Sequence, residues 1–148
     1  MSKTKNNIPL AKDIMSSPVT SVTLSHSVRQ VLQLTRDKQV SGFPIIDMEG
    51  RAVGVISTFD LITEESLGKD HLKLAELPLA IKVEKDVIQL TQDTPIKEAL
   101  LLFIKHGVGR IIITDEKKVV CGIISRKDVV NFFLDRHFNQ SSRDDEHD

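Results

Sequence analysis

Two stretches of the chain carry their apolar residues at the spacing of one helix face, and β-branched runs follow each of them. Thr94 and Pro95 predict the start of the second of these helices, with Thr94 as its N-cap. Both helices should pack one face onto a sheet. The spaced positions, at i, i+3, i+4 and i+7, are Val28, Val31, Leu32 and Thr35 in one stretch and Ile96, Ala99, Leu100 and Phe103 in the other.

The segments around these helices follow from the same pattern of apolar and polar positions. The polar segments 47–50 and 115–118 each separate two β-branched runs, which predicts two hairpins. We expect a lead-in helix in residues 8–15, a strand from Val19 to Leu24, and a helix after Asp60 that stops at Gly68. One or two helical turns should follow around residues 71–77, and His106 to Gly109 should end the second spaced helix.

The last predicted helix, Val129 to Leu134, is apolar around most of its circumference. A helix of this kind requires burial on several sides, which predicts an interface between repeats or between subunits. The two ends of the chain, residues 1–7 and 139–148, are polar, and the second is acidic. We expect both ends to be disordered.

The two halves of the chain are copies of each other. The stretch Gly54-Val-Ile-Ser-Thr-Phe-Asp60 returns as Gly122-Ile-Ile-Ser-Arg-Lys-Asp128, and the offset of 68 residues between the two aspartates aligns residues 19–62 with residues 87–130 without a gap. In each copy an extended run turns into Ser-x-x-Asp and then into a helical segment. The serine can cap that helix, and the free first-turn N–H groups can hold an anion. A single such helix start is mostly structural, but its repetition is informative.

The order of elements, the G-x-x-S-x-x-D ending and the opening Asp13-Ile-Met-Ser-Ser-Pro-Val19 resemble the tandem cystathionine-β-synthase (CBS) domain pair, also called the Bateman module. The resemblance covers the chain from Asp13 to about Phe133. It implies an α/β fold of the α+β type, with two β-α-β-β-α repeats packed about a pseudo-twofold axis. We expect repeat one in residues 8–68, a linker in 69–80 and repeat two in 81–138.

The resemblance also implies two clefts between the repeats, in which adenosine-containing ligands bind. The motif aspartate takes the ribose hydroxyls, while nearby serine, threonine and basic residues take phosphate. This fits the chemistry, because a carboxylate accepts from two vicinal hydroxyls and a helix N-terminus favours phosphate. Carried over to this chain, the first cleft would contain Asp128, Ser125, Arg110, Ser16, Ser17, Pro18, Ser41, Phe43, Pro44, Arg126 and Lys127.

The second cleft would contain Asp60, Ser57 and Thr58. Its counterpart of Arg110 is Gly42, and its lead-in carries acidic residues where the first cleft has serines. Less positive and more negative charge weakens phosphate binding, so we rank the Asp128 cleft first. In the alternative interpretation, the motif serines and aspartates only cap and buttress helices. The basic residues of the first cleft could equally face solvent or form salt bridges.

Composition excludes several classes of function. A net charge of −1 argues against a nucleic-acid surface, and no apolar run reaches the roughly 20 residues of a membrane span. Met1 to Asn7 lacks the apolar core of a secretory signal, so we expect a cytoplasmic protein. The five histidines lack metal-ligand spacing, and Cys121 fits a small core residue. We expect no metal site, no catalytic cofactor and no enzyme, since neither an activated nucleophile nor an acid–base pair is present.

Two hypotheses for the function follow. In the first, the chain is a stand-alone regulatory module that binds AMP, ADP, ATP or S-adenosylmethionine as a regulatory ligand. It would signal to an unidentified protein through the geometry of a homodimer. Positive charge at Arg110, Arg126 and Lys127 favours a phosphorylated ligand. In the second hypothesis, the clefts are vestigial and the chain is a scaffold or interaction subunit.

Overall fold

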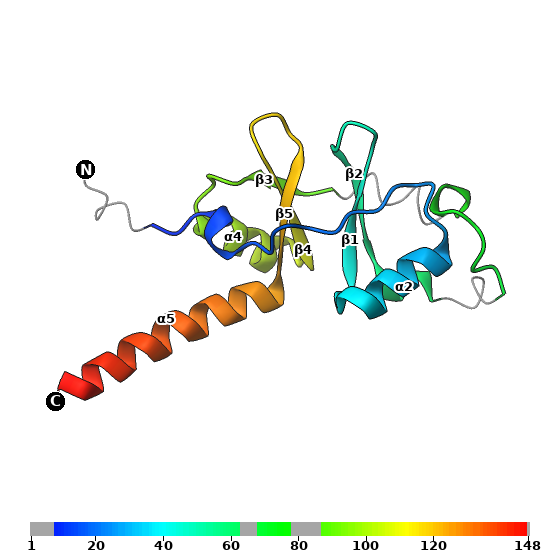
Figure 1. Cartoon of the computed structure of the whole chain (residues 1–148). Coiled ribbons are helices and arrows are strands. Elements are labelled where there is room, and N and C mark those ends of the chain that lie inside the picture. The colour runs from blue at the N-terminus through cyan, green and yellow to red at the C-terminus, as the bar shows by residue number, and fades with distance from the viewer. Residues whose placement is uncertain (1–7, 63–67, 78–86, 148) are drawn as a thin grey trace.

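The computed structural model describes residues 8–62, 68–77 and 87–147, with residues 137–147 described as backbone alone. Helices and short strands alternate along it (Figure 1), which confirms the predicted α+β class. In chain order the elements are α1 Ala11–Ile14, α2 Val28–Lys38, β1 Gly42–Ile46, β2 Ala52–Ser57, the 3₁₀ helix η2 Thr58–Leu61, the 3₁₀ helix η4 Leu74–Glu76, β3 Gln89–Thr91, α4 Ile96–His106, β4 Arg110–Thr114, β5 Val120–Ser125 and α5 Arg126–His147.

The duplication in the sequence is also present in the structure. Helices α2 and α4, strands β1 and β4, and strands β2 and β5 begin and end at positions that differ by 68 residues. The register agrees as well, because Gly42 pairs with Ser57 and Arg110 pairs with Ser125. Both hairpins contain an irregularity before the last residue of their first strand. The two repeats therefore present equivalent residues at equivalent places.

Each repeat has a core of its own, formed where a helix packs one face onto its hairpin. In repeat one, Val28 and Val31 of α2 contact a cluster that includes Phe43. In repeat two, Ile96 and Ala99 of α4 are buried with the isoleucines of β4 and β5. Strand β3 adds to that hairpin by pairing parallel to β4. The predicted packing of both helices is confirmed.

The lead-in segment crosses from one repeat to the other (Figure 1). The Ala11 N–H donates to the Thr94 carbonyl at 2.7 Å, and the Ser16 N–H donates to the Ile123 carbonyl at 2.9 Å, so its first part packs on repeat two. The Val22 N–H then donates to the Pro44 carbonyl of repeat one at 2.9 Å. The segment thereby links the two repeats, and Ser16 and Ser17 lie on the part of it that runs from one repeat to the other.

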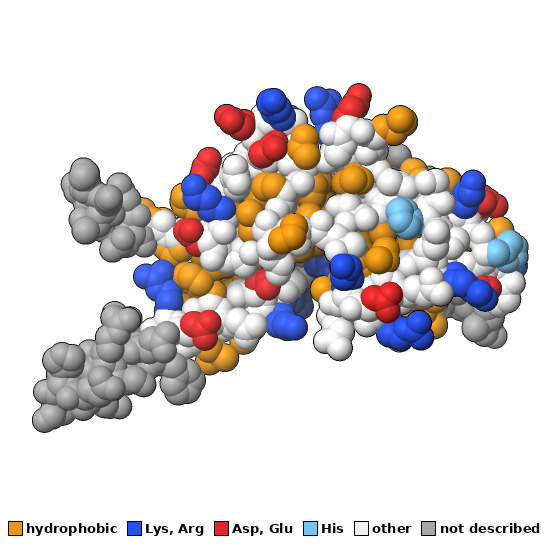
Figure 2. Space-filling view, viewed as in Figure 1, with side chains coloured by type: hydrophobic (Ala, Val, Ile, Leu, Met, Phe, Trp, Pro, Cys, Tyr) orange, Lys and Arg blue, Asp and Glu red, His pale blue; other side chains and the backbone are white. Residues whose placement is uncertain are grey.

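The tips of the two hairpins are charged, and hydrophobic side chains lie over the body below them (Figure 2). In each turn the aspartate at the first position accepts hydrogen bonds from backbone N–H groups. Asp47 accepts from Glu49 at 2.9 Å and from Arg51 at 3.0 Å, and Asp115 makes the equivalent bonds. These bonds explain why the polar segments form turns. In the described part of the chain, no helix is long and apolar enough to cross a membrane.

Three local predictions were wrong. Residues 19–24 form an isolated bridge between Val22 and Ile45 instead of a strand. Thr94 does not cap α4, since Pro95 is extended and occupies the N-cap position. Helix α5 continues to His147 through the acidic segment expected to be disordered. Extending an existing helix requires no new nucleus, which explains this continuation. Residues 1–7 and 63–67, which also carried predictions, lie outside the described residues.

Candidate functional site

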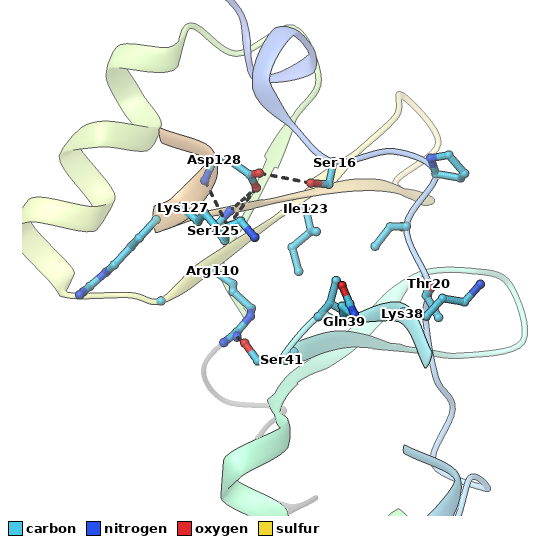
Figure 3. Close-up of a pocket in the computed structure, with 16 residues that line it drawn as sticks. Ser16, Thr20, Lys38, Gln39, Ser41, Arg110, Ile123, Ser125, Lys127 and Asp128 are labelled. Carbon is cyan, nitrogen blue, oxygen red and sulfur yellow. Dashed lines mark hydrogen bonds between the residues drawn. The ribbon is translucent and has the colours of Figure 1, made fainter. Parts of the chain in front are cut away.

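A cavity of about 590 Å³ lies between the two repeats (Figure 3). Its size falls in the range of small-molecule sites, roughly 300 to 1,000 Å³. Three segments form its walls: the lead-in, the end of α2 with the start of β1, and the junctions that flank the hairpin of repeat two. Of the residues that the sequence assigned to the first cleft, those lining this cavity are Asp128, Ser125, Arg110, Ser16, Pro18, Ser41, Arg126 and Lys127.

Ser125 and Asp128 hold each other at the start of α5. The Ser125 N–H donates to Asp128 Oδ2 at 2.8 Å and the Ser125 hydroxyl donates to the same oxygen at 3.1 Å. The Asp128 N–H donates back to Ser125 Oγ at 3.3 Å, which completes a reciprocal helix cap. The other oxygen, Oδ1, accepts from the Ser16 hydroxyl at 3.3 Å. The half-buried carboxylate is thus fixed in orientation at the wall of the cavity.

Arg110 joins the two repeats at the opposite side of the cavity. Its Nη2 donates to the Ser41 hydroxyl at 2.6 Å, and Figure 3 shows its side chain directed at Ser41. Burial lowers the pKa of the guanidinium below its usual value, and the charge of the Asp60 carboxylate opposes that shift.

Further cations surround the cavity. Arg126 and Lys127 lie at the start of α5, where the Arg126 Nε donates to the Val108 carbonyl at 3.1 Å. Lys38 lines the facing wall, at the end of α2. Together with Arg110 these side chains outnumber the carboxylate of Asp128, so the cavity favours an anion.

Lys38, Gln39 and Thr20 also line the cavity, and none of them was expected there from the sequence. The repeat offset pairs Lys38 with His106 and gives no sign of a cleft position. The only signal was its place directly before the stretch from Val40 to Asp47, which follows the family pattern.

Three residues assigned to this cleft lie elsewhere. Phe43 is fully buried in the core of repeat one, with 0% of its surface exposed. Pro44 is buried in β1 opposite Val55, and Ser17 is exposed outside the cavity lining. Successive strand residues point to opposite faces, so a continuous stretch such as Ser41 to Pro44 cannot all face one cleft.

The residues assigned to the second cleft do not repeat the Ser125–Asp128 arrangement. Ser57 precedes the 3₁₀ helix η2 without a side-chain cap in the described structure, and Asp60 is exposed. Thr58 is buried, and its hydroxyl lies 2.7 Å from the hydroxyl of Thr35 on α2. The bond ties η2 to α2, which is a structural role. The acidic lead-in residues of this cleft lie outside the described residues.

Comparison with known proteins identifies the repeats. The model of the CBS domain matches residues 11–66 and 80–135. The uncharacterized protein MJ1232 of Methanocaldococcus jannaschii is 31% identical over 127 residues, which cover 84% of this chain. The chain spans only 40% of the length of that relative.

Solved structures show the same architecture. The CBS domain pair of protein MJ0100, solved in complex with 5′-methylthioadenosine and S-adenosyl-L-methionine, matches with a TM-score of 0.72 at 22% identity. The match covers 87% of this chain and 98% of that one. CBSX2, solved in complex with AMP, matches with a TM-score of 0.69 at 23% identity, over 86% of this chain and 98% of that one. At these identities the likeness establishes the fold.

Proposed function

This chain belongs to the CBS domain family, and on that basis we propose that it is a regulatory module that binds an adenine nucleotide in the cavity between its repeats. One observation carries the proposal: a fixed carboxylate, Asp128, shares the cavity with Lys38, Arg110, Arg126 and Lys127. The complexes of CBS domain pairs with AMP and with adenosyl compounds support this class of ligand.

The chemistry of the walls suits the parts of a nucleotide. Asp128 Oδ1 has acceptor capacity for the ribose hydroxyls, and a ribose hydroxyl would take the place of the Ser16 hydroxyl that donates to it now. The phosphate would be held by the surrounding cations, of which Arg110 offers a planar set of donors. Ile123 and Val40 supply apolar surface for the base.

We further propose that the module signals as a homodimer to a protein still to be identified. Helices α4 and α5 expose large apolar side chains, including Ile104 with 78% of its surface exposed and Val130 with 54%. A groove of about 380 Å³ lies beside them, between the two helices and the lead-in at Ile8. A nucleotide that touches both repeats would favour one arrangement of them, and the dimer would transmit that preference.

Thermal unfolding in the presence of AMP, ADP, ATP and S-adenosylmethionine tests the proposal. A ligand at about 100 times its dissociation constant stabilises the folded state by about 2.7 kcal/mol, which is several degrees in Tm. Asp128→Ala should abolish the shift, whereas Asp60→Ala is the matched control and should retain it. The absence of any shift with all four ligands, measured on wild-type protein, would refute nucleotide binding.

A second candidate function is a ligand-free interaction subunit. The observation in its favour is that both Asp128 oxygens already accept hydrogen bonds from Ser16 and Ser125, as expected for a residue that only caps a helix. Under this alternative, Asp128→Ala leaves partner binding unchanged, and the exposed apolar faces of α4 and α5 are the functional surface.

A further inference from the structure

Gly42 and Arg110 occupy equivalent positions in the two repeats and meet at the interface between them. Each is the first residue of its strand, β1 or β4, and each pairs with the serine of the following motif. The Arg110 side chain lies where a side chain of residue 42 would be. A Cβ atom at position 42 would overlap the guanidinium and would stand 2.7 Å from Cδ of Arg110.

The backbone at Gly42 does not itself require glycine. Gly50, Gly68 and Gly107 have positive φ angles that favour glycine, whereas Gly42 is an extended strand residue. What the structure uses at Gly42 is the missing side chain, which allows Arg110 to approach the backbone of repeat one. The two positions are equivalent in the repeats and adjacent in space. A side chain at position 42 would therefore exclude the Arg110 side chain from its observed place.

The space over Gly42 determines where the guanidinium stands. From this position Arg110 donates to the Ser41 hydroxyl and lines the cavity that contains Asp128. An arginine that is already ordered beside a cavity loses less conformational entropy when it binds phosphate. A side chain at position 42 would move the guanidinium away from Ser41.

We propose that Gly42 is a positioning residue for Arg110. Because residue 42 has no side chain, the guanidinium of Arg110 can stand at the cavity, and this position sets a preference for phosphorylated over unphosphorylated adenosine ligands. The inference rests on the proposed nucleotide site and adds a determinant of its specificity. Gly42 acts through Arg110 and does not itself contact the phosphate.

Calorimetric titrations of AMP and adenosine into four proteins test this: wild type, Gly42→Ala, Arg110→Ala and the double variant. Wild type should bind AMP at least roughly tenfold more tightly than adenosine, the size expected of one hydrogen bond to a charged group. Gly42→Ala should reduce that ratio to the value of Arg110→Ala, and the double variant should show no further loss. Adenosine affinity should be similar in all four.

Lys105→Ala is the control for the loss of a positive charge away from the cavity. Lys105 is exposed in the last turn of α4 and does not line the cavity. Its AMP-to-adenosine ratio should equal that of wild type. Gly42→Ala should fold, because the overlap involves the end of a flexible side chain. A folding defect in Gly42→Ala that Arg110→Ala repairs would support the same steric pairing, and an unrepaired defect would refute it.

The two proposals fail in different ways. The role of Gly42 would be overturned if Gly42→Ala left the AMP-to-adenosine ratio unchanged, or if the effects of the two substitutions added in the double variant. AMP binding that depends on Asp128 would still leave the proposed function standing. Wild-type protein that binds neither AMP nor adenosine would refute the nucleotide site and this inference together.

Discussion

Asp128 and Ser125 are bonded in both directions at the first turn of α5. The Ser125 N–H reaches Asp128 Oδ2 at 2.8 Å, and the Asp128 N–H reaches Ser125 Oγ at 3.3 Å. Asp128 thus caps the helix with Oδ2, while its Oδ1 accepts from the hydroxyl of Ser16 in the lead-in. Structural and ligand-binding interpretations of the motif are therefore compatible, since the two oxygens can act separately.

The reciprocal cap predicts a cost in stability that is independent of any ligand. Asp128→Ala should lower the free energy of unfolding by about 1 kcal/mol, the usual net value of a hydrogen bond of this kind. Asp60→Ala should change it less, because Asp60 is exposed and Ser57 makes no side-chain cap at η2 in the described structure. Urea unfolding of both variants without ligand measures the difference. Equal losses in the two would show that the cap contributes nothing.

The fold could be predicted from the sequence because its main features are local and occur twice. The spacing of Val28 and Val31 determines which face of α2 is buried, and the same spacing at offset 68 determines it for α4. The contacts between repeats could not be predicted, since nothing in the sequence pairs Ala11 with Thr94. The length of α5 was missed because composition predicts disorder for an acidic segment, whereas an already formed helix can continue through it.

The candidate site was predictable where a motif fixes the backbone. The helix start points to Ser125 and Asp128 as a cap, and the family resemblance carried both of them and Arg110 over to the cleft; all three line the cavity. Lys38 could not be predicted, because its approach to the cavity depends on how the repeats pack. Phe43 was assigned to the cleft because it stands in a stretch that follows the family pattern, but that pattern does not tell which face of a strand meets the cleft and which meets the core.

The burial of Phe43 predicts a role in stability. Phe43→Ala should destabilise the protein by about 3 to 5 kcal/mol, because a large side chain is removed from a closed core. Phe59→Ala is the matched control, since 77% of Phe59 is exposed, and its effect should be small. Urea unfolding monitored by circular dichroism gives both values. A small loss for Phe43→Ala would place the ring outside the core.

The single cysteine predicts a dependence on pH. Burial, with a smaller contribution from the Asp115 carboxylate, raises the pKa of the Cys121 thiol. At a given pH the folded protein therefore contains less thiolate than an ordinary cysteine, whose pKa is about 8.5. The protonated Cys121 thiol therefore favours the folded state. This contribution to the free energy of unfolding is complete below the pKa of the unfolded chain and is lost as pH rises through the pKa of the folded protein.

Alkylation by iodoacetamide between pH 7 and pH 10 tests this, because Cys121 is the only cysteine in the chain. The native reaction should be slower than in urea-unfolded protein, and its midpoint should lie at higher pH. A native midpoint at or below the unfolded one would contradict the direction of the shift.

The proposed homodimer would form through the exposed apolar side chains of α4. Ile104→Glu should weaken a homodimer. Ile104 is 78% exposed in the single chain, and a second copy that covers this site would have to bury the new charge. Met48→Glu is the control, since Met48 is fully exposed at the tip of the first hairpin, away from α4 and α5. Sedimentation velocity over a range of concentrations should show a shift towards monomer for Ile104→Glu alone, with the circular dichroism of all three proteins unchanged. If Met48→Glu dissociates the protein and Ile104→Glu does not, the hairpin tips form the interface and the assignment to α4 is wrong.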